Sequence, residues 1–190
     1  MTDRRILTVG HSTHPLDEFL DLLQGAGAEL VVDVRRLPGS RRFPWFDQDA
    51  LSLSLAEHGI RYQRIVELTG RRPIQHDVPD DVDALWHNRS FHNYADYALG
   101  QDFARGLDEL VRLGGEQQVV VMCSEAVWWR CHRRIIADHL LARGIPVDHL
   151  MPEGRITAAE LTPGAVVGDG TVVYPAGATS PGPDEPRPQP

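Results

Sequence analysis

The stretch QVVVMCSEAVWWRCHRR, residues 118–134, says most about the architecture of this chain. Three consecutive valines and a methionine give the continuous apolar pattern of a parallel strand that is covered on both faces. Cys123 stands at the end of that strand, and apolar residues at helical spacing follow over residues 131–143, up to Gly144. A buried strand followed by a helix is the repeating unit of an α/β protein.

The same unit recurs on both sides of this stretch. Apolar runs at residues 5–9, 30–34, 60–66 and 147–151 predict further strands. Helices are predicted over residues 16–23, 47–59 and 94–113, and residues 69–89 are expected to form a long loop or a short helical insert. The alternation predicts a three-layer α/β fold, with a mostly parallel sheet of about five strands and helices on both faces.

The C-terminal part departs from this alternation. Asp169 and Gly170 lie between two apolar runs, which predicts a β-hairpin. We expect a single domain over residues 1–178, followed by a disordered, proline-rich tail over residues 179–190.

Composition narrows the classes of function. The formal charge of −8 argues against a generally basic surface for nucleic acid or membranes, although local patches remain possible. All 19 basic residues are arginines, so a Schiff-base lysine mechanism is excluded. The absence of a signal-peptide or membrane-spanning apolar run predicts a cytoplasmic protein. Only two cysteines occur, both in the loop and helix start that follow residue 122, which favours reduced thiols over a disulfide framework.

The loops that follow the predicted strands are the candidate site, because ligands of open parallel sheets bind beyond the carboxyl ends of the strands. Loop 123–134 combines two thiols, a carboxylate, an imidazole and arginines. A thiol near a helix amino end and beside such cations has a lowered pKa and is more nucleophilic. The alternative is that Cys123 is only a small buried apolar residue. The candidate catalytic residues here are Cys123, Glu125, Cys131 and His132.

Two further loops contribute candidates. His11 follows the first strand and could act as a general acid or base, or could only cap the next helix. Arg35 and Arg36 lie in a loop with several aromatic residues, a combination that holds phosphates and unpaired bases, although it is also typical of a solvated charged loop. Together with Arg130 and Arg133, they form the predicted anion-binding set.

A metal site is a second possibility for the cysteine loop. Thiolates and imidazole suit zinc, and Cys123, Cys131 and His132 could supply them, with the carboxylate of Glu125 as a further ligand. The spacing argues against it, because structural zinc sites usually pair cysteines two to four residues apart. We therefore expect no metal and no other cofactor. A third possibility is that the two cysteines form a redox-active pair.

The order of several short motifs matches a known family. These are Gly10-His11-Ser12, Val32-Asp33-Val34-Arg35, Pro38-Gly39-Ser40, Met122-Cys123-Ser124-Glu125 and Cys131-His132-Arg133. Over about residues 5–150 the chain resembles the bacterial and archaeal family called domain of unknown function 488. The resemblance implies functional roles for the residues of these motifs, which adds Ser12 and Asp33 to the set, but it implies no particular activity.

These observations predict an enzyme that acts on a phosphate-bearing substrate, such as a nucleotide or a nucleic-acid component. Arginines would bind the anion, while the Cys, Glu and His groups would transfer protons or attack the substrate. The alternative is a non-catalytic module that binds nucleic acid or another ligand. No membrane partner is expected.

Overall fold

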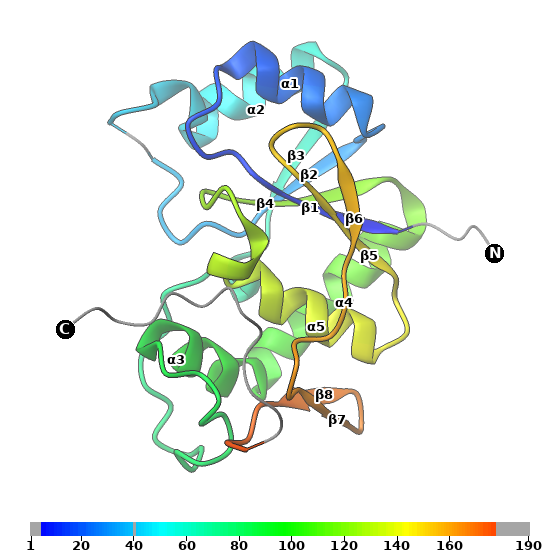
Figure 1. Ribbon diagram of the computed structural model, residues 1–190. Coiled ribbons are helices and arrows are strands. Elements are labelled where there is room, and N and C mark those ends of the chain that lie inside the picture. Colours follow the sequence, from blue (N-terminus) through cyan, green and yellow to red (C-terminus); the bar gives the residue numbers. More distant parts are fainter. Residues whose placement is uncertain (1–4, 40, 178–190) are drawn as a thin grey trace.

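The computed structural model describes residues 5–39 and 41–177, and the predicted tail at 179–190 lies outside them. Its centre is a six-stranded sheet in the order β3-β2-β4-β1-β5-β6 (Figure 1). The first five strands pair in parallel, and β6 pairs antiparallel with β5. The strands are β1 (Ile6–Gly10), β2 (Leu30–Asp33), β3 (Arg61–Arg64), β4 (Val119–Cys123), β5 (Val147–Leu150) and β6 (Ile156–Ala158).

Helices cover both faces of the sheet, which confirms the predicted three-layer α/β class (Figure 1). One face carries α1 (Leu16–Gly25) and α2 (Gln48–Glu57), and the other carries α3 (Arg89–Ala98), α4 (Gln101–Glu116) and α5 (Arg133–Ala142). The described residues also form three short 3-10 turns, namely η1 (Pro44–Phe46), η2 (Val66–Leu68) and η3 (Trp128–Arg130).

Strand β4 explains why its sequence is apolar without interruption. Val120 and Met122 belong to the core that α1 and α2 cover, whereas Val119 and Val121 belong to the core under α3, α4 and α5. Successive side chains of a strand point to opposite faces, so a central strand needs apolar residues at every position. All five residues of β4 are buried.

One sequence prediction about the helices was wrong, and one strand was not predicted. Residues 94–113 were expected to form one helix, but the chain forms α3 and α4 with a break at Leu99 and Gly100. Gly100 has an extended backbone, with φ −87° and ψ 163°, which ends one helix and begins the next. The sheet has six strands rather than about five, because the exposed three-residue strand β6 carries no pattern of burial that the sequence could reveal.

The predicted C-terminal hairpin is confirmed as β7 (Val166–Gly168) and β8 (Thr171–Val173). Tyr174, directly after β8, ties the hairpin to the body of the protein. Its backbone N–H donates to Asp83 Oδ1 at 2.8 Å, and its hydroxyl donates to Asp138 Oδ2 at 2.8 Å. All three residues are buried, so the hairpin is attached through the interior rather than at the surface.

Among the helices that the structure describes, none is long and apolar enough to cross a membrane.

Candidate functional site

The carboxyl ends of β1, β2 and β4 lie side by side and bring three loops together. Gly10 pairs with Cys123 across β1 and β4, and Asp33 pairs with Met122 across β2 and β4. The approach is closest at Gly10, where an added Cβ atom would lie 1.7 Å from the carbonyl oxygen of Glu125. Glycine is therefore required at position 10 if the cysteine loop is to pass over the end of β1.

Replacing Gly10 with alanine is expected to lower the free energy of unfolding by about 1–3 kcal/mol, because backbone must move to admit the methyl group. Denaturant unfolding would measure the change. Gly25→Ala is the matched control, since a Cβ atom there meets nothing within 4 Å. Equal stability of the two variants would show that the loop yields without cost.

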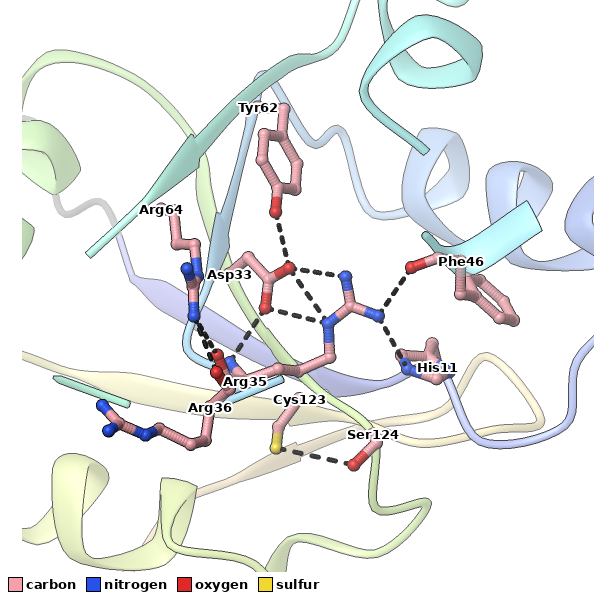
Figure 2. A network of polar contacts seen from close by, with 9 residues as sticks. All are labelled: His11, Asp33, Arg35, Arg36, Phe46, Tyr62, Arg64, Cys123 and Ser124. Carbon is pink, nitrogen blue, oxygen red and sulfur yellow. Dashed lines mark hydrogen bonds and ion pairs between the residues drawn. The ribbon is translucent and has the colours of Figure 1, made fainter. Parts of the chain in front are cut away.

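Asp33 and Arg35 form a buried ion pair below this edge (Figure 2). Arg35 Nη2 lies 2.6 Å from Asp33 Oδ2, and Arg35 Nε donates to both carboxylate oxygens at 3.0 Å. Arg35 Nη1 donates to the carbonyl of Phe46 at 2.7 Å, and the hydroxyl of Tyr62 donates to Asp33 Oδ2 at 2.6 Å. The guanidinium of Arg35 is thus largely engaged by the protein itself.

His11 joins the same network. Its ring stacks on Phe46 with the centroids 4.1 Å apart, and its Nε2 lies 3.3 Å from Arg35 Nη1 (Figure 2). Burial, and secondly the charge of Arg35, lower the pKa of His11 to about 4. His11 is therefore neutral near pH 7, with Nε2 as the acceptor toward Arg35 and Nδ1, 3.0 Å from the carbonyl of Ser12, as the donor.

Two thiols and one imidazole gather at the end of β4 and the start of α5. His132 Nδ1 lies 3.7 Å from Cys131 Sγ and 4.0 Å from Cys123 Sγ. The other ring nitrogen, Nε2, lies 3.2 Å from the carbonyl oxygen of Val34, and Arg133 Nε donates to Cys131 Sγ at 3.3 Å. The trio of Cys123, Cys131 and His132 is called the thiol–imidazole cluster below.

The two thiols differ in acidity. The hydrogen bond to Cys131, and then burial, raise the pKa of Cys123 well above its ordinary value. Burial opposes ionisation of Cys131 too, but the hydrogen bond from Cys123 and the neighbouring His132 and Arg133 lower its pKa well below the ordinary value. Of the two thiols, Cys131 is therefore the one whose surroundings favour the thiolate.

The cluster opens into a pocket with a volume of about 240 Å³. Its wall includes three exposed arginines from three different loops, Arg36, Arg71 and Arg130, and the exposed carboxylate of Glu125. The full lining is Arg35, Arg36, Leu37, Gly70, Arg71, Ser90, Phe91, Tyr94, Cys123, Ser124, Glu125, Arg130, Cys131 and His132.

A family model described as Domain of unknown function DUF488 matches residues 15–140, more than half of the chain. The chain belongs to this family. The DUF488 match contains the whole cysteine loop and the strand that ends at Asp33, whereas β1 and the C-terminal hairpin lie outside it. Comparison with curated proteins gave no match, and comparison with solved structures gave none either.

The structure divides the predicted site residues of this DUF488 protein into two groups. Cys123, Glu125, Cys131, His132, Arg36 and Arg130 line the pocket, as does the engaged Arg35. The others lie around it. Asp33 and Arg133 are buried beneath the pocket, and Arg133 Nη2 donates to the carbonyl of Glu125 at 2.6 Å. His11 and Ser12 lie at the end of β1. The backbone N–H of Ser12 donates to the carbonyl of Ser124.

Sequence reasoning did not assign several residues of the pocket wall to the site, and Arg71 and Tyr94 are the two with the clearest chemical role. Arg71 follows η2, in the segment expected to form a long loop or a short helical insert, and Tyr94 begins the stretch that was predicted only as a helix. Tyr94 is fully buried and packs its ring 4.8 Å from that of His132, so it belongs to both core and pocket. Arg71 had a usable signal, since it follows the carboxyl end of a predicted parallel strand, the edge at which ligands bind.

Proposed function

We propose that the protein is an enzyme acting on a phosphate-bearing substrate, such as a nucleotide or a nucleic-acid component. The observation that carries the proposal is the convergence of Arg36, Arg71 and Arg130 on the pocket that also contains the thiol–imidazole cluster. One guanidinium group can donate two parallel hydrogen bonds to phosphate oxygens, and exposed arginines are available for such contacts.

The division of labour follows from burial. Arg35 and Arg133 are buried and hold Asp33, Phe46, Glu125 and Cys131 in place. The three exposed arginines bind the phosphate, and the cluster stands where the reacting atom of the substrate arrives. Glu125, an exposed carboxylate in the same wall, accepts or returns protons. A pocket that excludes part of the water strengthens each of these electrostatic contacts.

Binding of phosphate ligands tests the anion half of the proposal. Inorganic phosphate, a nucleoside monophosphate and a short single-stranded oligonucleotide would be titrated by calorimetry against the protein and against Arg36→Ala, Arg71→Ala and Arg130→Ala. Each variant is expected to bind roughly 10-fold to 100-fold more weakly, since a charge-assisted hydrogen bond is worth about 1.5–3 kcal/mol. Arg155→Ala, which removes an exposed arginine that pairs with Glu153, is the matched control.

Turnover tests the enzymatic half. The ligands that bind would be incubated with the protein and analysed by mass spectrometry for any new product. Cys131→Ser and His132→Ala should retain phosphate binding and lose turnover. A non-catalytic binding module would instead leave every ligand chemically unchanged. If all arginine variants bound phosphate as tightly as the control variant does, the whole proposal would be wrong.

A further inference from the structure

The thiol–imidazole cluster has the composition of a metal site. Within residues 5–39 and 41–177, it is the one group of three or more potential metal ligands whose donor atoms all lie within 4.8 Å of one another. Two thiolates and an imidazole form the three-ligand set of one class of catalytic zinc site, in which a fourth position is left to water or substrate. We propose that Cys123, Cys131 and His132 bind a zinc ion whose fourth position opens into the pocket.

The distances suit this coordination. Tetrahedral zinc with Zn–S near 2.3 Å and Zn–N near 2.0 Å places sulfur and nitrogen ligands roughly 3.6 Å apart. The separations of 3.7 and 4.0 Å between His132 Nδ1 and the two sulfurs need only small side-chain movements to reach that value. The spacing of the two cysteines in the sequence is unlike that of structural zinc sites, but a three-ligand site built at a strand end needs no such pairing.

The orientation of His132 is an independent argument. Its Nε2 lies 3.2 Å from the carbonyl oxygen of Val34, so this nitrogen is the N–H donor, and in the neutral ring Nδ1 presents its lone pair toward the sulfurs. Histidines that bind metals usually donate their second N–H to a carbonyl or carboxylate in this way. A Cβ atom at Gly70 would lie 2.8 Å from Nδ1, so glycine there leaves space at the ligating atom.

The surroundings of Cys131 and the charge balance fit as well. Arg133 Nε donates to Cys131 Sγ at 3.3 Å, the kind of hydrogen bond that supports a thiolate ligand. Two thiolates neutralise a divalent zinc ion, so the buried Arg133 leaves the centre with one net positive charge. Such a centre attracts an anion at its open position. A catalytic role of the zinc ion as a Lewis acid rests on the proposed function. Binding of zinc by the protein is measured separately from catalysis.

Cobalt substitution tests the site directly. The reduced, full-length protein would be freed of metal with a chelator and titrated with Co²⁺ and then with Zn²⁺. We expect one Co²⁺ per chain, with a thiolate-to-cobalt charge-transfer band and the intense visible bands of tetrahedral cobalt, all abolished when zinc replaces it. Loss of a residue that only supports a metal ligand lowers metal affinity roughly 10- to 100-fold. Cys131→Ser and His132→Ala should each lower the affinity for cobalt by more than that.

His58→Ala removes an exposed histidine on the far side of the sheet and serves as the control, with unchanged affinity. Protection of both thiols of the wild-type protein from alkylation by one equivalent of zinc is a second readout that needs no variant. The inference fails if wild-type protein binds no more cobalt than Cys123→Ser Cys131→Ser, or if zinc leaves both thiols reactive. Arg36→Ala Arg130→Ala should keep the metal and lose phosphate, so failure of the metal site and failure of the phosphate pocket are seen separately.

Discussion

Asp33→Ala is expected to lower the free energy of unfolding by about 3–5 kcal/mol, the cost of leaving one member of a buried ion pair without its partner. Asp33 is fully buried and Arg35 is 4% exposed, so water cannot replace the lost carboxylate. The carboxylate also accepts the hydroxyl of Tyr62 and the backbone N–H of Arg35. Urea unfolding, followed by circular dichroism, gives the value.

Two companion variants separate the ion pair from its surroundings. Tyr62→Phe removes a single hydrogen bond and should cost about 1 kcal/mol. The double variant Asp33→Ala Arg35→Met should be more stable than Asp33→Ala alone, because the uncompensated charge is gone. If the double variant is instead the less stable, Arg35 contributes mainly through its bond to Phe46 rather than through Asp33.

The second large effect concerns Asp83 and Asp96, two buried carboxyl groups, of which Asp96 raises the cost of ionising Asp83 inside the fold. Burial is the main cause that raises the pKa of Asp83, to about 7, and burial raises that of Asp96 as well, against the opposing charges of His92 and Arg89. Among the described residues, no donor hydrogen-bonds to Asp83 Oδ2 or Asp96 Oδ1, and His92 Nε2 lies 3.6 Å from Asp96 Oδ1. Asp83 therefore carries a proton below about pH 7, which we expect it to share with Asp96.

The sign of the effect follows from the raised pKa. The stability that the proton provides is fully present below the unfolded-state value near 3.8 and is lost as the pH rises through about 7. In Asp83→Asn the amide replaces the shared proton at every pH. The stability of this variant relative to wild type should therefore rise by up to about 4 kcal/mol between about pH 4 and pH 9.

Thermal unfolding across that pH range would measure the difference, with Asp81→Asn, an exposed carboxylate of the same loop, as the control. A constant difference between Asp83→Asn and wild type would mean that the two carboxyl groups titrate independently of folding. The amide oxygen introduced by Asp83→Asn can still accept the backbone N–H of Tyr174, so the attachment of the C-terminal hairpin is preserved in the variant.

The fold class could be predicted because its main signal is local. Residues 119–123 are apolar at every position, and a fully buried strand can be recognised from that pattern alone. The order β3-β2-β4-β1-β5-β6 could not, since it depends on how the connections pack and leaves no periodicity in the sequence. The break at Gly100 was missed because the apolar residues on both sides keep helical spacing.

The candidate site was predicted in its residue types but not in its division of roles. Arg35 and Arg36 are neighbours with the same side chain, yet Arg35 is buried in an ion pair and Arg36 is exposed in the pocket wall. Arg130 and Arg133 differ in a similar way, because Arg133 is buried and Arg130 is exposed in the pocket wall. An arginine is buried where it finds hydrogen-bond partners such as Asp33 and the carbonyl of Glu125. The folded structure brings these partners together, so the sequence alone does not reveal them.

The two edges of the sheet influence whether copies of the protein associate through their strands. A strand at an edge has unpaired backbone groups that can add a strand from another molecule, the first step of aggregation. Strand β3 forms one edge of the sheet. It is only four residues long and carries Arg61 and Arg64 at its two ends. An approaching β3 from a second molecule would bring like charges together, which is one of the devices that keep exposed edges from joining. The opposite edge, β6, is only three residues long and offers a short template. The sheet therefore discourages edge-to-edge fibre growth by charge at one side and by shortness at the other.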